Sequence, residues 1–179
     1  MRPPVTPWLV ELTATPPVPE GTVLNFEEFF SAEHDRLYRA LCLVTRNRHE
    51  AEEIMQDAFL ALWSRWERIS RDVDDPVAYL YRSAMNVFRR RHRRAALAAR
   101  RAVRLIPPDD GLRRVEDQEA IVRALAALSP KQRAAIVLTN FLDFTAEEAG
   151  SFLGLSPGAV RTLASRGRAD LRRQAGGEA

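Results

Sequence analysis

The stretch TAEEAGSFLGLSPGAVRTLASRGR, residues 145–168, contains the start and stop signals of two consecutive helices. Thr145 stands three residues before a glutamate, which is the spacing of a capping box, and Ser156 stands before a proline as a cap does. Gly154, between these signals, favours the left-handed conformation that ends a helix. The stretch therefore predicts a short helix over 146–153, a turn at 154–156 and a longer helix over 157–173.

Two helices joined by a short turn that contains glycine have the spacing of a helix-turn-helix. The second helix of such a unit enters the major groove of DNA with its N-terminal end first. A capping hydroxyl, small residues and arginine forks suit contact with phosphates and guanine edges. The candidate contacts are Ser156, Gly158, Ala159, Arg161, Thr162, Ser165, Arg166 and Arg168. The alternative interpretation is an ordinary helical hairpin with a solvated arginine face.

The rest of the chain shows helical periodicity and linkers, without the alternation that is typical of strands. One helical pattern begins at Asn25, a second runs over about 50–69, and Asp75 with the following proline starts a third. We predict an all-α fold of two small helical domains joined by a flexible linker, with the helix-turn-helix in the second domain. The predicted segments are a disordered proline-rich tail at 1–21, a first domain at 22–95, a linker at 96–115, a second domain at 116–175 and a short tail at 176–179.

Charge is distributed unevenly along the chain, although the net charge is only +3. Residues 22–75 contain 12 acidic and seven basic residues, whereas residues 76–108 contain nine arginines and no acidic residue. This division predicts an acidic face for one partner and a basic face for a polyanion. A GC-rich genome would also favour arginine over lysine, but that bias does not explain why the arginines cluster.

Several classes of protein find no support in the sequence. The one cysteine, Cys42, lies in an apolar helical stretch and reads as a small buried hydrophobe, with a redox switch as the alternative. One cysteine and three scattered histidines predict neither a disulfide nor a metal or cofactor site. The chain has no glycine-rich phosphate loop or nucleophile motif of an enzyme. Without an apolar stretch long enough for a membrane or a secretion signal, we expect a cytoplasmic protein.

Two separate stretches resemble the extracytoplasmic-function (ECF) sigma factors of bacterial RNA polymerase. The sequences ALSPKQR at 127–133 and LGLSPGAV at 153–160, followed by Ser165-Arg166, resemble domain four of these proteins. The sequence EAEEIMQDAF at 50–59 with Leu62-Trp63, and the helix that begins at Pro76, resemble domain two. The resemblance covers about 25–175, lacks a third domain, and is nearest to the actinobacterial branch.

The resemblance implies an alternative sigma factor, which binds core RNA polymerase and directs transcription from particular promoters. Domain two would bind polymerase, open the minus-ten element and hold the displaced strand, and domain four would read the minus-thirty-five element. An anti-sigma factor is a further expected partner. The alternative is a stand-alone helix-turn-helix regulator, which would leave the similarity over 50–94 unexplained, and a third possibility is a decoy held only by protein partners.

The resemblance also assigns residues to these roles by their positions in the matching motifs. Polymerase binding is assigned to Glu53, Gln56, Asp57, Leu60 and Trp63. Minus-ten binding is assigned to Tyr79, Arg82, Ser83, Asn86, Arg89, Arg90 and Arg93, with the whole 89–94 arginine run near phosphates. Minus-thirty-five binding is assigned to Arg133, Ser156, Pro157, Gly158, Ala159, Arg161, Thr162, Ser165, Arg166 and Arg168. Trp63, Trp66 and Tyr79, taken singly, also fit a packed core.

The second domain departs from the family pattern in three places. Glu148-Ala149-Gly150 stands where Glu-Ile-Ala is usual, which predicts that the short helix packs with less volume. Leu163 removes a usual basic residue, which puts the usual minus-thirty-five contacts in doubt. Gly167 replaces a usual alanine inside the recognition helix, and we expect it to cost up to about 1 kcal/mol of helix stability.

Overall fold

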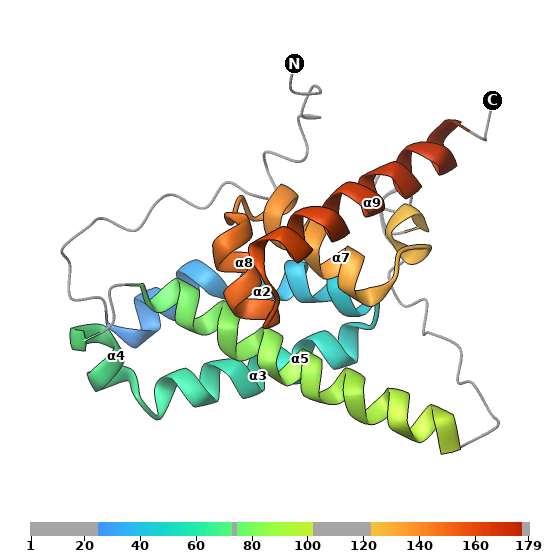
Figure 1. The fold of residues 1–179 in the computed structure, drawn as a ribbon. Helices are drawn as coiled ribbons and strands as arrows, with labels where there is room; N and C mark the ends of the chain where they lie inside the picture. Colours follow the sequence, from blue (N-terminus) through green and yellow to red (C-terminus); the bar gives the residue numbers. More distant parts are fainter. Residues whose placement is uncertain (1–24, 73–74, 102–122, 177–179) are drawn as a thin grey trace.

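Three of the four helices described in the N-terminal half begin at a side chain that caps them. The computed structural model describes residues 25–72, 75–101 and 123–176, and every regular element within these ranges is a helix. Asn25, Asn47 and Asp75 each accept a hydrogen bond of 2.8 to 2.9 Å from a backbone N–H three residues later. The helices that follow are α2 (Phe26–Thr45), α3 (Arg48–Trp63), α4 (Trp66–Asp72) and α5 (Pro76–Arg101) (Figure 1).

The single helix predicted over 50–69 is wrong, because α3 ends at Trp63 and α4 begins at Trp66. At the break, Ser64 Oγ donates to the Ala61 carbonyl at 3.0 Å. The Trp66 ring lies against α2, with its centroid 5.4 Å from that of Phe26 and 5.1 Å from that of Phe29. These contacts bury aromatic surface, and they account for the turn that the periodicity of the sequence did not reveal.

The C-terminal half contains the predicted start and stop signals. Thr145 forms a complete capping box and Ser156 Oγ accepts the Ala159 N–H at 3.2 Å, both at predicted positions, and Ser129 forms a further capping box at the start of the preceding helix. Gly154 ends its helix with φ 63°, in the left-handed region, as predicted. The elements are α7 (Pro130–Ile136), the π-helical turn η1 (Val137–Phe141), α8 (Ala146–Leu153) and α9 (Pro157–Gly176). The prediction of a short helix, a turn and a long helix is confirmed.

The two halves pack directly on each other. α5 contacts α3 and α8, while α2 contacts α7 and η1, so that α8 lies above the N-terminal helices in Figure 1. At the α5–α8 contact, the Tyr81 ring lies 4.9 Å from Phe144 and 6.5 Å from Phe152, and Tyr81 is fully buried. The sequence had given no sign of this packing, and the predicted linker falls mostly in residues 102–122, outside the described residues.

The core runs through both halves as a result. Leu37, Ile54 and Leu80 are fully buried in the N-terminal half, and Leu125 and Leu138 are almost as deeply buried in the C-terminal half. Cys42 is buried too, which confirms its interpretation as a small core residue. Among the described residues, no helix has both the length and the apolarity to cross a membrane, and no cluster of side chains is suited to a metal ion.

Candidate nucleic-acid interface

Two glycines set the geometry of the helix-turn-helix. Gly154 takes the left-handed conformation between α8 and α9. The Leu155 N–H donates to the Gly150 carbonyl at 2.9 Å, which folds the turn back onto α8. A Cβ at Gly150 would lie 2.7 Å from the Leu155 carbonyl oxygen, closer than such atoms approach. Gly150 is therefore a position of close backbone approach and not a packing deficit, which corrects the expectation from its sequence.

The start of α9 presents a mixed polar surface. Thr162, Ser165 and Arg166 are exposed, and the space around Gly158 is open. Arg161 is also exposed and pairs with Glu147 at the start of α8 at 3.0 Å, so that this ion pair joins the two helices of the unit. Arg168 is half-buried and donates to Asn140 Oδ1 at 3.3 Å.

Four of the predicted residues near the start of α9 either bond to the helix itself or are partly covered. Ser156 caps α9, and Pro157 and Ala159 are half-buried. The Thr162 hydroxyl donates to the Gly158 carbonyl at 2.9 Å. Ser165 and Arg166 are also predicted to contact DNA. Both are exposed, and neither forms a hydrogen bond or ion pair within the part of the chain that the structure describes.

Gly167 is buried where α9 crosses α7. A Cβ at this position would lie 2.6 Å from Ile136 Cδ1 and 3.5 Å from Gln132 Cβ. The absence of a side chain thus allows the two helices to approach closely, and this packing offsets the propensity cost expected from the sequence. Leu163 is half-buried and packs against the core, which explains an apolar residue where the family pattern has a basic one.

Arg133, which the family resemblance assigns to the minus-thirty-five contact, is buried between the two halves in this structure and does not lie on the exposed surface of α9. Its side chain is only 6% exposed. Nε donates to the Val44 carbonyl of α2 at 2.7 Å, and Nη1 donates to the Leu125 and Leu128 carbonyls at 3.2 Å each. Burial, and to a lesser extent Arg46, lowers its pKa to about 10. Arg133 therefore stays charged at neutral pH and joins the two halves.

The predicted minus-ten residues lie along α5. Some of them contact α8 or the turn that follows it, and others are exposed to solvent. Arg82 Nη2 lies 3.4 Å from Ser151 Oγ of α8. Arg89 donates to Asn86 Oδ1 at 3.3 Å, and its guanidinium lies directly on Gly154 in the turn. Arg90 and Arg93 are exposed, whereas Ser83 is half-buried. The two halves therefore cover part of each other's predicted DNA surface.

Arg91 belongs to a different set of contacts from its neighbours in the arginine run. It pairs with Glu53 and, at 3.2 Å, with Asp57, and so joins α5 to α3. The hydrogen bond from Arg91 lowers the pKa of the Glu53 carboxyl. Sequence reasoning had placed Arg91 near phosphates and both acids in a polymerase contact, whereas the structure pairs them with one another.

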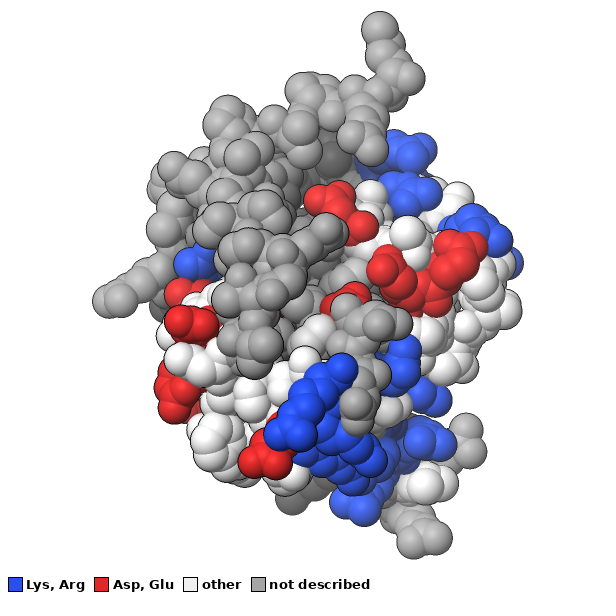
Figure 2. Space-filling view, turned by 90° about the vertical axis from the view of Figure 1, so that its left-hand side faces the viewer, with Lys and Arg blue, Asp and Glu red and all other residues white. Residues whose placement is uncertain are grey.

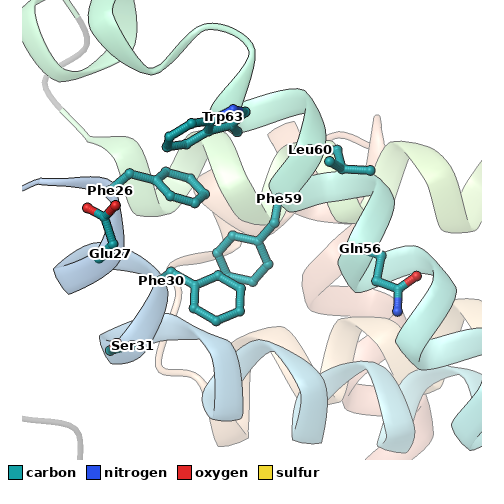
Figure 3. Close-up of a pocket in the computed structure, with 8 residues that line it drawn as sticks. All are labelled: Phe26, Glu27, Phe30, Ser31, Gln56, Phe59, Leu60 and Trp63. Atoms are coloured by element: carbon teal, nitrogen blue, oxygen red, sulfur yellow. The ribbon is translucent and has the colours of Figure 1, made fainter.

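An apolar groove lies between α2 and α3, which we term the α2–α3 groove. Figure 3 shows aromatic side chains from the two helices turned toward one another, with Leu60 and Gln56 further along α3. The groove has a volume of about 740 Å³, and Leu60 and Trp63 are 65% and 55% exposed. Its lining residues are Phe26, Glu27, Phe30, Ser31, Gln56, Phe59, Leu60 and Trp63. The exposure of Trp63 favours an interface role over a core role.

The groove brings together three of the residues predicted for polymerase binding: Gln56, Leu60 and Trp63. It leaves out the Arg91-paired acids Glu53 and Asp57. It also adds Phe26, Phe30 and Phe59, which were not among the residues predicted for polymerase binding. Their apolar periodicity was visible in the sequence, but their meeting with Trp63 depends on how α2 and α3 pack.

A second hollow, near the break between α3 and α4, was missed because the sequence was read as one helix. We term it the α4 arginine surface, and its volume is about 960 Å³. It is lined by Trp63, Ser64, Arg65, Trp66, Glu67, Arg68 and Arg71. Arg65 Nη1 donates to the Tyr79 hydroxyl at 2.9 Å, which connects this surface to α5. Figure 2 shows basic side chains gathered in dense patches on the face at the α4 end of the molecule.

Comparisons with known proteins give the same order of domains as the sequence resemblance. Residues 29–97 match the family described as sigma-70 region 2, and residues 118–171 match sigma-70, region 4. The RNA polymerase sigma-E factor of Streptomyces coelicolor is 30% identical over 156 residues, which are 86% of this chain and 88% of that protein. The ECF RNA polymerase sigma factor SigM of Mycobacterium tuberculosis is 29% identical over 157 residues, covering 87% and 80%.

Solved structures have the same fold. The sigma factor RpoE in complex with the anti-sigma factor NepR from Bartonella quintana aligns with a TM-score of 0.72 at 21% identity, covering 83% of this chain and 94% of that one. CnrH in complex with the cytosolic domain of CnrY aligns with a TM-score of 0.60 at 25% identity, covering 86% and 89%.

Proposed function

This chain belongs to the ECF group of the sigma-70 family, and on that premise we propose how its surfaces divide the work of promoter recognition. It is an alternative sigma factor, which binds core RNA polymerase and directs initiation at particular promoters. Sigma factors are not enzymes, so its residues position polymerase and DNA while polymerase performs the chemistry. Its place of action is then the cytoplasm, with the polymerase.

The minus-thirty-five element is read by the start of α9. The observation that carries this proposal is the close glycine-dependent turn, which places the start of α9 beside α8 with Ser165 and Arg166 exposed. Ser156, Pro157, Gly158 and Ala159 bring the backbone of the helix start close to phosphate, where the helix dipole favours an anion. Arg161, Thr162 and Arg168 lie beside them, and an arginine that binds guanine adds about 1–3 kcal/mol of discrimination.

The minus-ten element is held along α5 and the α4 arginine surface. Exposed Arg90 and Arg93 meet the phosphates, while Tyr79, Ser83 and Asn86 face unpaired bases. Aromatic rings and arginines are the side chains that bind unstacked single strands. Arg65, which is bonded to Tyr79, extends this surface toward α4. Arg82 and Arg89 join it once they leave α8 and the turn.

Core polymerase binds the α2–α3 groove. Its exposed Leu60 and Trp63 form an apolar patch with Gln56 at one side, and buried aromatic side chains are the usual anchors of protein interfaces. Glu53 and Asp57 act through Arg91, which keeps α3 and α5 in register.

The closed packing of the two halves has to open on a promoter. The positions that give the two elements their names are about 25 base pairs apart. This separation corresponds to about 85 Å along B-form DNA at 3.4 Å per base pair. A folded body of about 130 residues has a radius of gyration near 14 Å, so the packed halves cannot span that length. Since the similar sigma factor RpoE was solved in complex with the anti-sigma factor NepR, we include an anti-sigma factor that favours the closed form among the partners.

Reconstitution with core RNA polymerase, followed by run-off transcription from genomic fragments, tests the proposal. We expect a stable complex and transcripts from a limited set of start sites. A protein that binds duplex DNA tightly by itself and yields no transcript with core polymerase would instead be the stand-alone helix-turn-helix regulator.

A further inference from the structure

We propose that the N-terminal segment Pro7–Leu12 of this chain occupies the α2–α3 groove in the free protein and competes there with core RNA polymerase. The proposal rests on the assignment of that groove to polymerase binding. It concerns a groove that is otherwise open in the described structure and a segment that the sigma-factor function leaves without a role.

The groove leaves a large apolar surface to be covered. Leu60 is 65% exposed, Trp63 is 55% exposed and Phe30 is 37% exposed, and all three lie in one hollow of about 740 Å³. Contiguous apolar patches of this kind on a soluble protein mark binding sites or sites of aggregation. A free sigma factor that waits for polymerase therefore gains from a weak, replaceable cover.

The chain supplies a matching segment. The sequence PWLVEL at residues 7–12 places Trp8, Leu9, Val10 and Leu12 within six residues, in a tail otherwise rich in proline. Tryptophan is among the residues that most often anchor an interface, because it buries a large rigid surface. A groove lined by phenylalanine, leucine and tryptophan side chains provides the complementary pocket.

The connection between segment and groove is short enough to favour this contact. Helix α2 begins at Phe26, and Phe26 and Glu27 themselves line the groove, so the tail joins the structure at the edge of its own binding site. Twelve residues separate Leu12 from Asn25. A flexible chain of that length spans about 20 Å on average, which allows the segment to turn back along α2. A short tether gives an effective concentration near millimolar, so that even a weak contact is populated.

Competition follows because both ligands need the same side chains. The tail reduces the fraction of free protein whose groove is open, and polymerase affinity falls by that fraction. We expect Trp8→Ala with Leu12→Ala in the full chain to tighten core polymerase binding about two- to tenfold. The matched control is Val5→Ala with Val18→Ala, which removes methyl groups from the same tail outside the segment and should leave the affinity unchanged.

A cross-linking experiment tests docking without polymerase. Cys42 is buried, so new cysteines are the reactive ones. Glu11→Cys paired with Gln56→Cys should form an intramolecular disulfide under mild oxidation. Glu11→Cys paired with Arg172→Cys, an exposed site on α9, should not. Equal yields in the two pairs would overturn the proposal, as would unchanged polymerase affinity in the Trp8 and Leu12 variant.

One further variant separates this proposal from the function of the groove. Leu60→Ala should weaken binding of core polymerase if the groove is its site. If Leu60→Ala has no effect on polymerase binding, the assignment of the groove is wrong. If it weakens binding while the tail variant and the Glu11 and Gln56 pair both fail, only the proposal of tail occupancy is overturned.

Discussion

Replacement of Gly150 by alanine tests the close approach that shapes the helix-turn-helix. In an exposed helix interior, glycine to alanine stabilises a protein by up to about 1 kcal/mol. At Gly150 the new Cβ would lie 2.7 Å from the Leu155 carbonyl oxygen and 3.5 Å from the Pro157 nitrogen. Both are backbone atoms, so relief requires that the turn move relative to α8.

The magnitude follows from these two opposed effects. Overpacking of a filled interior costs about 1–3 kcal/mol, and the propensity gain of about 1 kcal/mol offsets part of it. We expect Gly150→Ala to lower the free energy of unfolding by up to about 2 kcal/mol. It should also weaken transcription from promoters that depend on the minus-thirty-five element, because α9 is displaced.

Urea denaturation followed by circular dichroism measures the stability change, and two other glycines calibrate it. Gly158→Ala meets open space and should be neutral or slightly stabilising, although it crowds the proposed phosphate approach. In Gly167→Ala the new Cβ meets the flexible end of the Ile136 side chain, so its free energy of unfolding should lie between those of the Gly150 and Gly158 variants. If Gly150→Ala is as stable as Gly158→Ala, the argument from close backbone approach is refuted.

Three other predictions follow from charged residues. Arg133→Gln should destabilise the fold by about 2–3 kcal/mol in urea titrations, because it leaves buried carbonyls such as that of Val44 without a donor; an unchanged midpoint would contradict the bridging role. Arg93→Ala should reduce the salt dependence of open-complex formation by about one counterion, whereas Arg91→Ala should lower stability and leave that slope unchanged, since Arg91 pairs within the protein. Glu33 is almost fully buried and burial raises its pKa, so the folded state binds its proton more tightly than the unfolded state and its contribution to stability is lost as pH rises through the raised pKa. Glu33→Gln should therefore melt at a higher temperature than the wild type at pH 7, and this difference in melting temperature should become smaller as the pH falls toward 4.5. An equal difference at both pH values would contradict the explanation by burial of the carboxylate.

The sequence by itself determined the helices of the recognition unit and the type of protein. Caps at Ser129, Thr145 and Ser156 and the stop at Gly154 are interactions between residues three or four positions apart, so local spacing is sufficient to predict them. Local sequence was also sufficient to predict the family motifs and the excess of arginine on α5. It predicted three residues of the α2–α3 groove as well: Gln56, Leu60 and Trp63.

Only the tertiary structure decided which of the predicted site residues are available. Arg133 bonds to Val44, 89 positions away, and Arg91 pairs with Glu53, 38 positions away. Such contacts depend on which helix faces pack together, and many packings satisfy the same hydrophobic periodicity. The meeting of Phe26 with Trp63, and the close approaches at Gly150 and Gly167, likewise come from packing and not from spacing. Sequence thus predicted the helices and their chemistry, while the docking of the two halves determined which charges are exposed and which are buried between them.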